Sequence, residues 1–104
     1  MTTNDCVPAL PWGAAGCTEW ELDGDELYRI VYTDEQRVDG CEHGVHLSAL
    51  QHPDGTLSRE NPTEIYVYIA GDGPLSGAQS RALAQMLLDA AEQADGWAAL
   101  ESSE

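Results

Sequence analysis

The sequence predicts a single α+β domain, in which an about four-stranded, mostly antiparallel sheet (a meander) is packed by one long C-terminal helix. Three observations support this fold class. Apolar and polar residues alternate over 45–51 and 64–70, as they do in half-buried strands. Turn signals containing Asp-Gly separate the candidate strands. From Ser76 onward, apolar residues recur at helical spacing as far as Trp97.

The chain of 104 residues has the length of one domain. Residues 1–16 are rich in Pro, Gly and Ala and show no period, so we expect an irregular N-terminal arm that Trp12 pins to the body. The folded domain is expected to span residues 17–97. Residues 98–104 are expected to form a frayed tail.

A β-hairpin is predicted over residues 18–32, around Asp23 and Gly24. This pair tolerates the positive φ values of a type I′ turn. With Asp23 and Gly24 as the two turn residues, Leu22 would pair with Asp25 across the hairpin.

Two further strands are predicted at 45–51 and 64–70, after a polar loop at 33–44. A sheet with a helix on one face has a second face, and here this face would carry tyrosines, among them Tyr66 and Tyr68, together with Leu50. We expect the N-terminal arm to cover part of the second face, and the alternative is that a partner contacts it.

The C-terminal helix is the strongest signal, and we expect it from about Gly77 to Asp95. Ser76 and Gln79 have the spacing of a capping box, in which each side chain satisfies a backbone donor of the other residue. Gly96 stands where a C′ glycine would end the helix.

A formal net charge of -15, with four arginines and no lysine, argues against nucleic acid or an anionic membrane as a direct ligand. The acids are spread along the chain, as solubility alone would require, except for one cluster in the predicted hairpin. This cluster and the tyrosines of the second face are the candidate partner-binding residues: Glu19, Glu21, Asp23, Asp25, Glu26, Tyr66 and Tyr68.

One constellation has the residue types of a zinc site. Its candidate ligands are Cys17, Cys41, His43 and His46. The chain lacks a Cys-x-x-Cys pair, so the competing interpretation is a buried structural cysteine beside surface histidines. Three cysteines are an odd number and form no dense framework, which favours a reducing cytoplasm. No signal peptide and no apolar run of membrane-spanning length is visible.

Catalysis has weak support. Cys41 with His43 or His46 offers a thiol and a base, but no oxyanion donors can be recognised around them. Gly71-Asp72-Gly73 has too few glycines and no lysine for a phosphate-binding loop. The sequence therefore predicts a protein that is not an enzyme and that needs no cofactor, apart from the structural zinc left open above.

The stretch Leu-Ser-Gly-Ala-Gln-Ser-Arg-Ala-Leu-Ala-Gln-Met-Leu-Leu-Asp-Ala-Ala at 75–91 resembles the C-terminal helix of a group of small actinobacterial and actinophage proteins. In that group a part bearing Cys, His and Trp precedes a short sheet, and the resemblance covers residues 41–97. It implies the fold and an actinobacterial or phage source. It implies no activity, because the group has none assigned.

Three hypotheses on function follow. The first is a small acidic binding or accessory module, encoded by a phage or another mobile element, that acts through contact with a protein partner. The second is a small domain held together by structural zinc. The third is an acidic nucleic-acid mimic that occupies a basic host protein. Homodimerisation through the second sheet face is left open.

Overall fold

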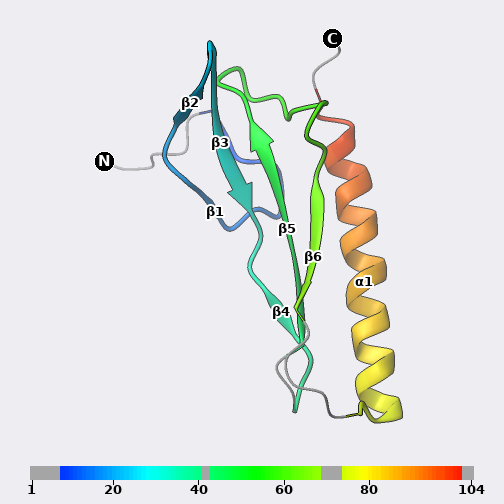
Figure 1. Cartoon of the computed structure of the whole chain (residues 1–104). Coiled ribbons are helices and arrows are strands. Elements are labelled where there is room, and N and C mark those ends of the chain that lie inside the picture. Colours follow the sequence, from blue (N-terminus) through cyan, green and yellow to red (C-terminus); the bar gives the residue numbers. More distant parts are fainter. Residues whose placement is uncertain (1–7, 41–42, 69–73, 102–104) are drawn as a thin grey trace.

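The computed structural model describes residues 8–40, 43–68 and 74–101, which form six β-strands and one α-helix (Figure 1). The chain is an α+β domain, as the sequence predicts, with an antiparallel sheet packed by the C-terminal helix. The strands are β1 (Gly16–Cys17), β2 (Glu21–Asp23), β3 (Glu26–Tyr32), β4 (Gln36–Arg37), β5 (Gly44–Gln51) and β6 (Glu64–Tyr68), and the helix is α1 (Gly77–Ala98).

The six strands occupy four antiparallel rows. β1 and β2 both pair with β3, β3 and β4 pair with one edge of β5, and β6 pairs with the other edge of β5. Between β3 and β4 the chain advances four residues, from Tyr32 to Gln36, while its partners advance three, from Ser48 to Val45. One extra residue therefore makes a β-bulge and divides the row into two strands. A bulge with one extra residue also separates β1 from β2, in their pairing with β3.

The hairpin is present, but its turn lies one residue later than predicted, which shifts the cross-strand partner of Leu22 by two residues, from Asp25 to Leu27. Leu22 pairs with Leu27 and Asp23 with Glu26, so the turn residues are Gly24 and Asp25. Gly24 has a φ of 65°, and no non-glycine residue among those described has a positive φ. A type II′ turn needs positive φ at its first central position alone, and a glycine there meets this need.

The predicted loop at 33–44 also needs correction, because it contains β4 and a buried side chain, Val38. The sequence did not predict this short strand because its residues are polar. Val38 donates its backbone N–H to the carbonyl of His43 at 3.0 Å, which continues the pairing beyond β4.

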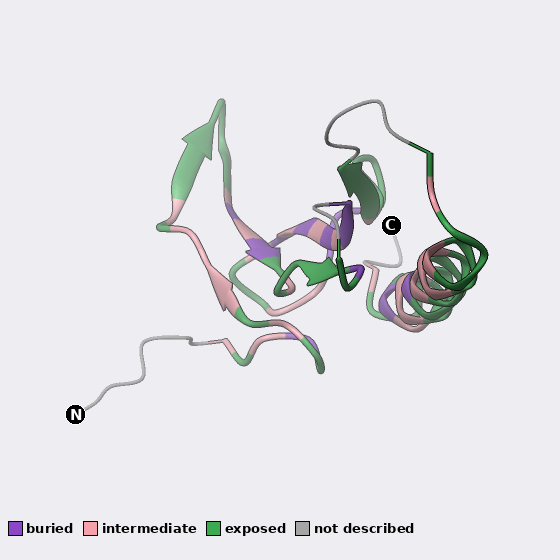
Figure 2. Cartoon of the chain, turned by 90° about the horizontal axis from the view of Figure 1, so that it is seen from below, coloured by how far each residue is buried: buried purple, intermediate pink, exposed green. Residues whose placement is uncertain are grey.

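One hydrophobic core lies between the sheet and α1. The helix runs along one face of the sheet and contacts β5 and β6 (Figures 1 and 2). The core is formed by alternate residues of the strands, one residue of the following loop and the inward side of the helix: Val31, Val45, Leu47, Ala49, Leu57, Ala90 and Trp97. The alternation predicted for β5 is confirmed by this set.

The start of α1 is as predicted and its end is not. Ser76 and Gln79 form the reciprocal capping box, with both hydrogen bonds at 3.0 Å. The helix continues through Gly96 to Ala98, because the fully buried Trp97 fixes the last turn against the sheet. Beyond the helix, Leu57 donates its N–H to the carbonyl of Leu100 at 2.9 Å, so the chain is held there and is not frayed from residue 98.

Replacing Ser76 by alanine is expected to lower the free energy of unfolding by about 1 kcal/mol, because the N–H of Gln79 loses its acceptor. For a domain of this size that corresponds to a fall in Tm of about 4–8 °C, which calorimetry measures. Ser80→Ala is the control, since Ser80 is exposed on the same helix and its change to alanine favours helix formation. Equal Tm values for the two variants would show that the cap contributes nothing.

The N-terminal arm lies on the helix side of the sheet, and not on the second face as predicted (Figure 2). Leu10 and Ala14 pack against the core, and the indole N–H of Trp97 donates to the carbonyl of Trp12 at 3.0 Å. The arm is attached to this side because the core positions of the central strands carry two polar residues, Arg29 and Gln51, which bond to its backbone.

Candidate protein-binding groove

The second face of the sheet is not covered by α1 or by the described part of the arm (Figure 2). Strand alternation places aromatic and aliphatic residues on it, with His46 opposite Tyr66 and Ile30 opposite Leu50. The rings of His46 and Tyr66 are stacked, with centroids 5.0 Å apart. Each of these four side chains is half-buried or exposed. This face is thus an apolar surface in contact with solvent.

A groove with a volume of about 770 Å³ crosses this face near the tip of the β2–β3 hairpin. We name it the acidic groove. Its floor consists of Tyr28, Ile30 and Leu50. A smaller hollow of about 200 Å³, which also touches Ile30 and Leu50, extends it along the sheet to Tyr66. An extended peptide segment could therefore follow the face from the hairpin toward β6.

Carboxylates line the acidic groove on both sides. The hairpin supplies Asp23 and Glu26, and the loop after β5 supplies Asp54 and Glu60. Arg59 and His52 are the basic side chains among the described lining residues, and Arg59 is exposed. The groove therefore combines an apolar floor with an excess of negative charge.

Asp23 and Glu26 are direct cross-strand partners. Two like charges placed opposite each other in an antiparallel pair reduce the stability of the hairpin. The exposed apolar pair beside them, Leu22 and Leu27, gives little compensation, because solvent reaches both side chains. A cation bound between the two carboxylates would relieve their repulsion.

Two pKa shifts report the local electrostatics. The pKa of Tyr28 is raised above 10.0, first by the negative charge of Glu21, then by partial desolvation and by Asp23. Negative charge nearby opposes formation of the phenolate, so a raised pKa of Tyr28 is the shift expected in an acidic environment. The pKa of Asp54 is lowered by hydrogen bonds from the hydroxyl and the backbone N–H of Thr56, at 2.7 and 2.9 Å. Asp54 therefore stays ionised at neutral pH.

The structure brings together part of the predicted partner-binding set. Asp23 and Glu26 line the acidic groove, and Tyr66 lines its extension. Glu21 accepts a hydrogen bond from the hydroxyl of Tyr28 at 3.4 Å. The remaining three residues lie outside the groove: Asp25 in the hairpin turn, Glu19 in the bulge between β1 and β2, and Tyr68 at the end of β6.

The partner-binding residues chosen from the sequence do not include those of the floor and the second wall of the groove. Alternation within β3 already places Tyr28 and Ile30 on one face, and this signal could have found the floor. Asp54 and Glu60 come from a loop whose position depends on Leu57, which is buried in the core. No local sequence pattern indicates that this loop faces the hairpin.

The predicted zinc ligands that the structure describes do not all lie together. Cys17 pairs with Val31 and packs on the core side of the sheet, whereas His46 stacks on Tyr66 on the opposite face. His43 is buried before β5, and Cys41 lies outside the described residues. Across 8–40, 43–68 and 74–101, no group of three or more His, Cys, Asp and Glu side chains is placed to hold a metal.

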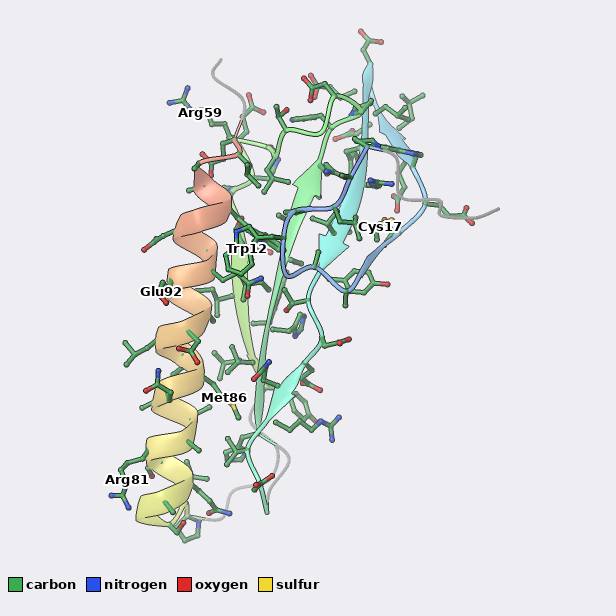
Figure 3. All side chains as sticks on the ribbon, turned by 180° about the vertical axis from the view of Figure 1, so that it is seen from behind. Trp12, Cys17, Arg59, Arg81, Met86 and Glu92 are labelled. Carbon is green, nitrogen blue, oxygen red and sulfur yellow. The ribbon has the colours of Figure 1, made fainter. Side chains whose placement is uncertain are left out.

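A second cavity, of about 430 Å³, lies between the arm, β5 and α1. It is lined by Trp12 and Met86, both labelled in Figure 3, and by core residues such as Val45 and Leu47. The cavity lies along the contact between the arm and the helix. Its position next to the core indicates that it results from the packing of these elements.

Comparison with known proteins gives no relative: no protein-family model, no curated protein and no solved structure matches this chain. In the described part of the chain, no helix combines the length and the apolar character needed to cross a membrane.

Proposed function

We propose that this protein is a non-enzymatic binding module that takes a cationic segment of a partner protein in the acidic groove. The observation that carries the proposal is the pairing of Asp23 with Glu26 at the edge of an apolar floor. This arrangement costs stability in the free protein, and a bound Arg or Lys side chain would offset that cost.

The groove fits such a segment in two ways. Its carboxylates can accept paired hydrogen bonds from a guanidinium group, and the ring of Tyr28 offers a face for a cation–π contact. Ile30 and Leu50 provide apolar contact for the side-chain stems or for a neighbouring aliphatic residue. We therefore expect the groove to prefer a segment in which arginine stands next to leucine or isoleucine.

The charge of the whole chain supports the same class of partner. A formal net charge of -15 attracts a basic protein over a distance and raises the rate of association. Nucleic-acid-binding proteins present Arg and Lys at their phosphate contacts, so they are one partner class with the required chemistry. The acidic-mimic hypothesis is thereby contained in the proposal as a special case.

Neutralising the hairpin carboxylates is expected to weaken binding of a Leu-Arg-Leu-Arg peptide about tenfold, measured by calorimetry. The double change Asp23→Asn and Glu26→Gln removes two partly exposed ion-pair partners, each contributing up to about 1 kcal/mol. The control is Glu92→Gln with Asp95→Asn, which removes the same charge from the exposed side of α1. We expect the control to bind within twofold of the unmodified protein.

Equal losses in the two double variants would show that net charge alone attracts the peptide, and the groove would be rejected as its site. A peptide with glutamate in place of arginine should not bind. Tyr28 gives an independent readout: because the arginine peptide neutralises nearby carboxylates, its binding should lower the raised pKa of the phenol toward 10.0.

A further inference from the structure

β6 has an open edge whose hydrogen-bonding groups can be assigned from the neighbouring rows. Leu47 accepts from the N–H of Thr33 and donates its own N–H to the Thr33 hydroxyl, both at 3.0 Å, so its backbone points toward β3 and β4. Its partner Ile65 is then in a non-hydrogen-bonded pair with β5. The N–H and C=O groups of Ile65 and Val67 therefore point outward, away from the sheet. No described strand pairs with them.

This edge lacks most of the devices that normally block edge-to-edge pairing. Such edges carry charged side chains (above all lysine), proline, a bulge or an inward-pointing charge, and of these β6 has a single charged side chain, Glu64 at its first residue. Ile65 and Val67 stand on the core side of the sheet but are 38% and 44% exposed. The open edge is thus weakly protected and mainly apolar.

The adjacent flank of α1 continues the apolar surface. One flank of the helix faces the arm, since Gln93 donates to the carbonyl of Trp12 and Gly96 lies against the Trp12 ring. Helical geometry of 100° per residue places an uncharged set on the opposite flank, beside β6. These residues are Ser80, Ala84, Leu87, Ala91 and Ala98, and all are exposed. Their mostly small side chains let another helix approach closely.

We propose that two copies of this chain associate through β6, with the two strands antiparallel about a two-fold axis at Tyr66. Ile65 of one copy then pairs with Val67 of the other, and the outward N–H and C=O groups of both residues find partners. The sheet continues across the dimer, and the two copies of α1 lie antiparallel on one side of it. The acidic groove, on the other face over β3 and β5, stays open in both copies.

Charge complementarity favours a second copy as the occupant. Arg81, the one cationic residue of α1, lies in its first half, whereas the acids Glu92 and Asp95 lie in its second half (Arg81 and Glu92 are labelled in Figure 3). Asp89 lies on the flank that faces the arm and takes no part in this contact. Antiparallel helices bring the Arg81 end of each copy to the acidic end of the other, and their dipoles oppose. In the strand, Glu64 would face the hydroxyl-bearing Tyr68 of the second copy and not another acid.

Ala91→Glu is expected to convert the dimer to a monomer, measured by sedimentation equilibrium of the full chain at about 0.5 M salt, where repulsion between chains is screened. The unmodified protein should have twice the chain mass of 11.2 kDa. Ala78→Glu adds the same charge to an exposed alanine of α1 outside the proposed flank, and it should remain dimeric.

Val67→Pro provides a second test, because it removes an outward N–H and leaves the bonds to β5 intact. It should be monomeric, with a circular dichroism spectrum like that of the unmodified protein. A monomeric unmodified protein at high micromolar concentration would overturn the proposal. So would a dimer that survives Ala91→Glu and Val67→Pro but is lost on His46→Glu, since it would then form through the second face.

Discussion

Replacing Trp97 by alanine is expected to lower the free energy of unfolding by about 3–5 kcal/mol, a large part of the total for a domain of this size. The side chain is 0% exposed and is the largest in the core. Its indole N–H also holds the arm through the carbonyl of Trp12. The change therefore removes packing, leaves a cavity and releases the arm at once.

Urea unfolding followed by circular dichroism measures this loss. Leu88→Ala is the control, because Leu88 lies on the same helix and is 65% exposed. We expect it to cost less than about 0.5 kcal/mol, as surface changes usually do. If the two variants lost similar stability, α1 would not be anchored by Trp97 as the structure shows.

Replacing Arg29 by alanine has the second largest expected effect, about 3 kcal/mol, because its buried guanidinium makes two hydrogen bonds, and a hydrogen bond to a charged group contributes about 1.5–3 kcal/mol. Arg29 is 1% exposed, and its guanidinium bonds to the side chain of Gln51 at 2.8 Å and to the carbonyl of Pro8 at 2.6 Å. The ring of Trp20 covers it at 4.6 Å. Without Arg29, buried acceptors lose their donor and the arm loses an attachment to β3.

Limited proteolysis distinguishes this mechanism from a general loss of packing. Cleavage within residues 8–15 should become faster in Arg29→Ala under conditions where the sheet and helix remain folded. Arg37→Ala is the control, since Arg37 is exposed on β4 and pairs with Glu35 at the surface. Unchanged cleavage of the arm in Arg29→Ala would contradict the proposed attachment.

Local patterns predict the elements of this fold better than their pairing. Alternation identifies all of β6 and all of β5 except its first residue, and the capping box fixes the start of α1, because both signals depend on neighbouring residues. The two bulges and the hairpin register depend on which residues meet across strands. Gly96 was expected to end the helix, but the burial of Trp97 one residue later outweighs the tendency of glycine to stop it.

In the candidate site, too, features set by neighbouring residues could be predicted, and features set by the pairing of distant residues could not. The hairpin acids could be predicted because they are adjacent in sequence. Convergence of Cys17 with His46 could not be judged, since it requires the face of each strand, and the structure places the two on opposite faces. The helix-side position of the arm depends on Arg29 and Gln51, whose burial has no local signature.

An NMR titration shows whether the acidic groove is where a cationic segment binds. The ¹⁵N-labelled protein is titrated with the Leu-Arg-Leu-Arg peptide at pH 7, and backbone amide shifts are followed. We expect saturable changes at Tyr28, Ile30 and Leu50, with α1 from Ala84 to Ala91 unchanged. Changes confined to α1 or the arm, or spread evenly over the acidic surface, would show that the peptide does not bind in the acidic groove.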